Sequence, residues 1–146
     1  MSEKNTDKSQ EVIKYIDNKW PDIMKLLEAD NISELDSDTI NKALQILEDV
    51  VNPDSHSLMQ FGLEVITTHQ LRNIYSQLRN KRKPQDLLLE RPRLAYIAAR
   101  EKKFAPVAGL IDKMIVHATD KNMSNFKYIM ESIVAYHKFY NTDKNT

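Results

Sequence analysis

Apolar side chains recur at intervals of three and four residues along most of the chain, the period of an amphipathic α-helix. The first apolar stripe begins near residue 9 and comprises Val12, Ile13, Ile16, Trp20, Ile23, Met24 and Leu27. Pro21 interrupts this stripe and predicts either a kink or a second helix with Pro21 in its first turn. After the polar segment NISELDSD, the next stripe comprises Ile40, Ala43, Leu44, Leu47, Val50 and Val51. We expect Ser37 or Asp38 to cap this second helix, which ends before Pro53.

The middle of the chain contains one ambiguous segment and one clear helix start. We expect NPDSHS to form a loop, whereas LMQFGLEVI is compatible with a strand, a short helix or a buried loop. Thr67 is followed three residues later by Gln70, which is the form of a capping box. The helix that it opens buries Leu71, Ile74, Tyr75 and Leu78.

Prolines mark the helices of the last third. KPQD has the composition of a turn, and LLL that of an apolar connector. Pro92 suits the first turn of a helix that continues to about Lys103, and Pro106 the first turn of the next helix. That next helix buries Val107, Leu110, Ile111, Met114 and Ala118. We expect Ser124 to cap the last helix, whose inward side chains are Phe126, Ile129, Met130, Ile133, Val134, His137 and Tyr140.

These patterns predict an all-α protein, a compact bundle of five or six helices forming a single domain over residues 1–146. The chain has only two glycines, which argues against Rossmann and P-loop phosphate sites. It has no cysteine, which excludes disulfides, zinc–thiolate sites and thiol catalysis. The N-terminus lacks the apolar core of a signal peptide, and no apolar run approaches the roughly 18 residues of a membrane span. We therefore expect a cytoplasmic protein with no membrane partner.

The net charge of zero hides an asymmetry between the two halves of the chain. Residues 1–66 contain 6 Lys and Arg against 14 Asp and Glu, a net charge of −8. Residues 67–146 contain 15 against 7, a net charge of +8. Such asymmetry points to a polyanion partner for the basic half. The alternative is that the two halves neutralise one another, within the fold or between subunits.

Arginines repeat on the faces of two predicted helices in the basic half. Arg72 and Arg79 lie on one flank about 10.5 Å apart along the helix axis, which matches roughly three steps of a stacked strand. Guanidinium groups bind phosphate bidentately, and an aromatic ring between cations offers a base a stacking surface. The candidate polyanion-binding residues are Arg72, Arg79, Lys81, Arg82, Lys83, Arg93, Tyr96, Arg100 and Lys103. The alternative for either helix is a solvated charged face with a partly buried tyrosine.

No pattern in the sequence predicts an active site or a cofactor. The four histidines form no HExxH pair and no other close pair of metal ligands. Asp36, Asp38, Glu48 and Asp49 occupy cap and solvent-facing helix positions rather than a catalytic cluster. No arginine is followed by histidine in the RxxxxH pattern of one class of helical ribonuclease. The connector between Asn80 and Pro92 is also too long for a helix-turn-helix.

Three motifs, in order, resemble the small helical subunit of the type III-A CRISPR interference complex, the Csm complex. They are TTHQLRNIYSQLRN, LAYIAARE and FKYIMESIVAYHKFY, and the resemblance covers roughly residues 65 to 141. The family-like positions are Thr67, Thr68, Leu71 and Arg72; Tyr96, Ala98, Arg100 and Glu101; and Val134, Ala135, Tyr136, Phe139 and Tyr140. The acidic first 60 residues carry no family-like motif.

The resemblance implies a non-catalytic subunit that lines a ribonucleoprotein filament beside the guide RNA and its paired target RNA. Its implied partners are these RNAs, the other Csm subunits and further copies of the chain. Arg72, Arg79, Arg93 and Arg100 would then face RNA phosphate, and the acidic half would meet basic faces of adjacent copies. The alternatives from other classes are a helical protein–protein adaptor without direct RNA contact and a small hydrolase with an unfamiliar site.

Overall fold

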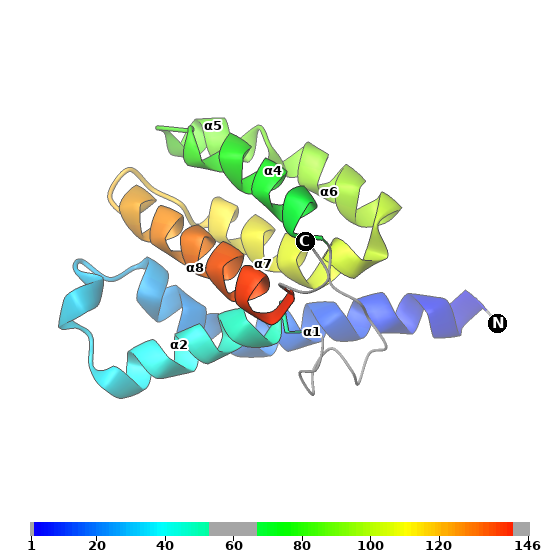
Figure 1. Cartoon of the computed structure of the whole chain (residues 1–146), viewed down its shortest axis with the longest axis horizontal. Helices are drawn as coiled ribbons and strands as arrows, with labels where there is room; N and C mark the ends of the chain where they lie inside the picture. The colour runs from blue at the N-terminus through cyan, green and yellow to red at the C-terminus, as the bar shows by residue number, and fades with distance from the viewer. Residues whose placement is uncertain (1, 53–66, 142–146) are drawn as a thin grey trace.

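The computed structural model of the chain describes the backbone of residues 2–52 and 67–141 and the side chains of residues 14–52, 67–101 and 103–141. Every regular element in these ranges is helical (Figure 1). The α-helices are α1 (Ser2–Leu27), α2 (Ser37–Asp49), α4 (Thr68–Arg79), α5 (Pro84–Leu88), α6 (Arg91–Arg100), α7 (Ala105–Val116) and α8 (Met123–Asn141). Two short 3-10 helices, Ile32–Glu34 and Lys102–Phe104, follow α1 and α6. The prediction of an all-α bundle is confirmed.

The helices lie in three tiers (Figure 1). α1 and α2 form one outer tier, α7 and α8 the middle tier, and α4, α5 and α6 the other outer tier. α8 packs against α4, α2 and α1, whereas α7 packs against α1, α5 and α6. The middle tier therefore holds the acidic N-terminal helices and the arginine-bearing helices on opposite sides of the molecule.

Each of the described α-helices contributes apolar side chains to one core cluster. The fully buried members include Leu26, Leu47, Leu71, Leu87, Leu110, Ile111, Phe104 and Phe126. Burying one such side chain stabilises the fold by about 1.5–3 kcal/mol relative to leaving it in water. The apolar stripes seen in the sequence are the core-facing sides of the helices, as expected from the 3.6-residue period.

In the acidic half, one of the two alternatives predicted for Pro21 is wrong, and so is the predicted cap of the second helix. α1 continues as one helix through Pro21, so no second helix begins there. Ile16, Ile23 and Leu26 are buried on both sides of Pro21, and this shared packing outweighs the local cost of proline. The cap of α2 is Asp36 rather than Ser37 or Asp38, because Asp36 has extended backbone angles and its carboxylate accepts a hydrogen bond from the Thr39 amide at 3.2 Å.

The basic half follows the sequence pattern more closely. The capping box is confirmed, with Thr67 and Gln70 each accepting from the backbone amide of the other. The segment expected to be a turn and connector forms the short helix α5, because Leu87 is fully buried in the core. α6 ends at Arg100, and α8 begins at Met123, so Ser124 lies inside the helix rather than at its cap. The predictions for residues 53–66 lie outside the described residues.

Candidate nucleic-acid interface

The predicted polyanion-binding residues lie on α4, on α6 and on the segments that follow these helices. The exposed ones are Arg72, Arg79, Arg82, Lys83, Arg93, Tyr96 and Arg100, and the partly buried ones are Lys81 and Lys103. Their positions follow from the apolar stripes, which turn the core-facing sides of α4 and α6 inward and leave the charged sides in solvent.

A groove of about 170 Å³ separates α4 from α6. Its lining comprises Gln70, Asn73 and Ile74 of α4 together with Arg93, Ile97, Arg100, Glu101 and Phe104. Of the predicted residues, the structure brings Arg93 and Arg100 together here, along one wall. Their spacing of seven residues corresponds to about 10.5 Å along the axis of α6.

Arg100 is oriented by a tyrosine rather than by an acid. Its guanidinium carbon lies 5.4 Å from the ring centroid of Tyr96, and Tyr96 is 64% exposed. A guanidinium stacked on an aromatic face keeps its N–H donors at the edge of the stack, free for another acceptor. Arg100 forms no ion pair with any described residue, so its positive charge remains available to a ligand.

Glu90 lowers the availability of two other predicted cations. Its carboxylate lies 3.6 Å from Lys81 Nζ and 3.6 Å from Arg93 Nη1. The Glu90 side chain is only 19% exposed, whereas that of Arg93 is 46% exposed. Both separations are longer than a hydrogen bond, so these are loose Coulombic pairs. Arg93 can therefore turn toward a stronger acceptor without losing a well-formed bond.

Arg72 and Arg79 lie on the other flank of α4. Arg79 stacks over Tyr75 at 5.6 Å, and the Tyr75 hydroxyl donates a hydrogen bond of 2.9 Å to Glu131 of α8. Burial, followed by this hydrogen bond, raises the pKa of Tyr75. Since each residue advances about 100° around a helix, Arg72 and Arg79 share the Tyr75 flank, while Asn73 faces α6. The structure therefore separates the two predicted arginine pairs onto two surfaces.

Gln70 connects the cap of α4 to the end of α6. Its Oε1 accepts from the Thr67 amide at 3.0 Å, and its Nε2 donates to Glu101 Oε2 at 3.0 Å. Both ends of the Gln70 amide are thus engaged, which fixes one end of the α4–α6 groove. The local sequence predicted the capping box but not the contact with Glu101, because these residues are 31 positions apart.

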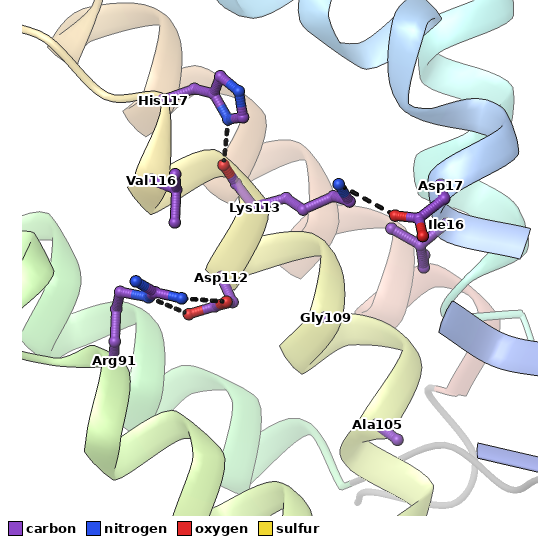
Figure 2. A pocket seen from close by; sticks show the side chains of 9 residues that line it. All are labelled: Ile16, Asp17, Arg91, Ala105, Gly109, Asp112, Lys113, Val116 and His117. Atoms are coloured by element: carbon purple, nitrogen blue, oxygen red, sulfur yellow. Dashed lines mark hydrogen bonds and ion pairs between the residues drawn. The ribbon is translucent and has the colours of Figure 1, made fainter. Parts of the chain in front are cut away.

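A larger groove, of about 460 Å³, runs along α7 between α1 and the start of α6 (Figure 2). The sequence did not predict this groove. Arg91 and Asp112 form a bidentate pair with separations of 2.8 and 3.1 Å on one side of α7. On the other side, Lys113 Nζ lies 3.0 Å from Asp17. Figure 2 shows both pairs beside the open surface over Gly109, where an added Cβ would meet nothing within 4 Å. The cations of this groove are neutralised, so it does not have the charge of a polyanion site. The only local sign of this groove in the sequence is the pair Asp112 and Lys113, the charged residues of the otherwise apolar helix α7.

A family model described as Csm2 Type III-A matches residues 48–143. The chain belongs to this family. It is therefore a small subunit of the type III-A CRISPR Csm complex, and the resemblance seen in its motifs is confirmed. Searches of curated proteins and of solved structures gave no significant match.

The residues matched by the family model can be located on the structure. They begin in the last turn of α2 and include all of α4 to α8, so they contain the whole α4–α6 groove and both arginine pairs. The α1 side of the α7 groove, Ile16 and Asp17, lies outside the match. The match begins earlier in the chain than the motifs at 65 to 141, which alone had suggested the family. Most of α1 and α2, the acidic part, lies outside the match.

The histidines of this Csm2 family member do not form a metal centre in the part of the chain that is described. His137 is fully buried, with Nδ1 3.1 Å from the Thr68 hydroxyl. The Nδ1 of His117 lies 2.9 Å from the carbonyl oxygen of Lys113. No helix among the described residues has the length and apolarity needed to cross a membrane.

Proposed function

We propose that this Csm2 family member binds the backbones of guide RNA and target RNA through α4, α6 and the adjoining basic segments, as a non-catalytic subunit acting in the cytoplasm in antiviral defence. One observation carries the proposal. Six of the eight predicted cations form no ion pair with another described residue, although the chain contains as many acids as bases. They are Arg72, Arg79, Arg82, Lys83, Arg100 and Lys103.

Unpaired cations on two helices and on the segments that follow them suit a backbone ligand. Phosphate contacts position a nucleic acid without reading its sequence. In an RNA-guided complex, base pairing between guide and target supplies the specificity, so a subunit beside the duplex needs only charge and shape. The placement of Arg72 and Arg79 away from Arg93 and Arg100 lets one subunit contact two segments of backbone.

Binding of the purified wild-type protein to labelled single-stranded RNA over a series of salt concentrations tests the proposal. The logarithm of the affinity should fall linearly with the logarithm of the salt concentration, by roughly 0.7 per phosphate contact for a single strand. Affinity should differ little between unrelated RNA sequences. Absence of RNA binding at low salt, together with retained binding to other Csm subunits, would favour the adaptor alternative.

The non-catalytic role is supported by the chemistry of the two grooves. The α4–α6 groove contains no serine, threonine or histidine, and the histidine of the α7 groove lies within hydrogen-bond distance of a backbone carbonyl. The purified subunit should therefore not cleave RNA with or without magnesium. Cleavage that persists through repurification and disappears with one point mutation in this chain would refute this role.

We also propose that copies of the chain associate head to tail in the filament, the acidic α1–α2 tier of one copy facing the basic helices of the next. Two ion pairs, Lys113–Asp17 and Lys121–Asp30, join the acidic and basic halves within the described fold. Glu28 and Glu34 remain exposed with no cation partner among the described residues. Sedimentation should show association that weakens with added salt, and a monomer at every salt concentration would contradict it.

A further inference from the structure

The α4–α6 groove has an apolar floor that phosphate binding does not require. Phe104 is fully buried beneath it, Ile74 is 6% exposed, and Ile97 is partly buried. The rim is polar, with the amide of Asn73 on one wall and the carboxylate of Glu101 at one end. A carboxylate repels phosphate, so the interior of the groove and its arginine wall suit different parts of a ligand.

We infer that the α4–α6 groove binds one unpaired nucleobase of RNA, with Arg93 and Arg100 contacting the phosphates on either side of that nucleotide. This inference rests on the proposed RNA binding and adds a ligand group that backbone contacts alone do not predict. Unpaired bases are the part of RNA that proteins can enclose, because their flat faces are apolar and their edges carry donors and acceptors.

The lining matches these properties of a base. The partly exposed side chain of Ile97, together with the edge of Ile74 that remains accessible, offers an apolar surface to the flat ring, and Phe104 supports this surface from beneath. The Asn73 amide supplies both a donor and an acceptor, and the Glu101 carboxylate supplies acceptors for an exocyclic amine. A volume of about 170 Å³ is well below that of the pockets of roughly 300–1,000 Å³ that hold drug-sized ligands, so the groove admits a small ring system rather than a duplex.

The position of Glu101 is fixed before any ligand arrives. Gln70 donates to Glu101 at 3.0 Å and is itself held by the Thr67 amide. One end of the groove is therefore preorganised, which reduces the entropy that binding must overcome. On the arginine wall, Arg100 is likewise held over Tyr96.

A comparison of two oligomers of equal length and charge tests the inference. One is a short oligocytidylate, whose bases carry an exocyclic amine, and the other is the same ribose-phosphate chain without bases. The wild-type protein should bind the oligocytidylate about fivefold or more tightly, the factor expected from enclosing one base. Equal affinities overturn the base site while leaving backbone binding intact. Failure of both oligomers to bind at low salt overturns the proposed RNA binding and the base site together.

Two matched variants of α4 test whether the preference for the oligocytidylate arises in the α4–α6 groove. Asn73→Ala removes an amide from the groove, and Gln77→Ala removes an exposed amide one turn further along that does not line it. Alanine favours helix at both positions, so folding should be retained, and circular dichroism checks this. Asn73→Ala should reduce the preference for the oligocytidylate by about threefold or more, within the range for one lost hydrogen bond, whereas Gln77→Ala should leave it unchanged. Equal effects of the two variants overturn the assignment of the base to this groove.

Discussion

Arg91 and Arg100 begin and end the same helix, yet their side chains have different partners. Arg91 makes a bidentate pair with Asp112, while Arg100 lies over the ring of Tyr96. The first arginine joins α6 to α7, and the second keeps its charge available. The sequence named Arg100 through its helical spacing, but it could not show the partner of Arg91, because Asp112 is 21 residues away. A residue type and its period therefore predict exposure, and only the fold distinguishes a structural cation from an available one.

At the residue scale, the cap of α2 predicts a pH-dependent stability. Hydrogen bonds from the Thr39 hydroxyl at 2.7 Å and the Thr39 amide at 3.2 Å lower the pKa of Asp36 below its ordinary value of 3.8. A lowered pKa in the folded state stabilises the fold above pH 3.8, and this stabilisation is lost as the pH falls through the folded-state value. Asp36→Ala should lower the melting temperature at neutral pH, and the difference from wild type should shrink in acid.

Thermal unfolding followed by circular dichroism at several pH values measures this effect. The matched control is Asp38→Ala, since Asp38 is an exposed first-turn residue paired only with Lys42 at 3.2 Å. At neutral pH, Asp38→Ala should lower the melting temperature less than Asp36→Ala does. A larger effect at Asp38 than at Asp36 would show that the cap is wrongly assigned.

At the element scale, the long helices were predictable and the short or interrupted ones were not. α4, α7 and α8 carry apolar stripes over three or more turns, and prolines or a capping box mark the starts of α4 and α7. α5 has only five residues, too few to show a period, and it forms because Leu87 enters the core. Likewise, no local rule could show that packing on both sides of Pro21 would keep α1 continuous. Local sequence patterns are therefore enough to predict long, uninterrupted helices, whereas short helices and the continuity of a helix through proline depend on tertiary contacts.

The middle of α7 provides a prediction at this scale. Gly109 lies in the helix interior, where glycine costs about 0.5–1 kcal/mol relative to alanine, and an added Cβ would meet no atom within 4 Å. Gly109→Ala should therefore raise the free energy of unfolding by about that amount, as measured by denaturant titration. The inverse control is Ala95→Gly at an exposed position inside α6, which should lower it by a similar amount. A loss of stability in Gly109→Ala would show that the α7 groove is filled in the folded protein.

At the scale of the whole molecule, the three tiers keep the acidic helices apart from the arginine-bearing helices. The acidic α1 and α2 lie on one side of α7 and α8, and the arginine-bearing α4 and α6 lie on the other (Figure 1). The sequence predicted the asymmetry and the identity of the basic residues. It could not predict that α4 would turn Arg72 and Arg79 toward one surface while Arg93 and Arg100 line a groove on another, because that division depends on which neighbour packs against each flank. The segregation is consistent with a subunit that contacts RNA on one side and another protein on the other.

The salt dependence of RNA binding in charge-reversal variants tests this account most directly. The double variant Arg72→Glu, Arg79→Glu reverses the charge of the proposed RNA-binding surface on α4. The double variant Arg93→Glu, Arg100→Glu reverses the charge of the proposed RNA-binding surface on α6. Each lost phosphate contact should flatten the slope of log affinity against log salt by roughly 0.7 for a single strand, to the same extent for unrelated RNA sequences. Because these arginines are exposed, each substitution should change the free energy of unfolding by no more than about 0.5 kcal/mol.

Arg91→Gln is the matched control, because Arg91 is an exposed arginine of the same helix whose charge is paired with Asp112. It should lower the melting temperature slightly and leave the salt slope of RNA binding unchanged. The account predicts flattened slopes with retained folding in both double variants and an unchanged slope in Arg91→Gln. Unchanged slopes in both double variants, accompanied by a loss of stability, would contradict RNA contact and assign these arginines to the fold itself.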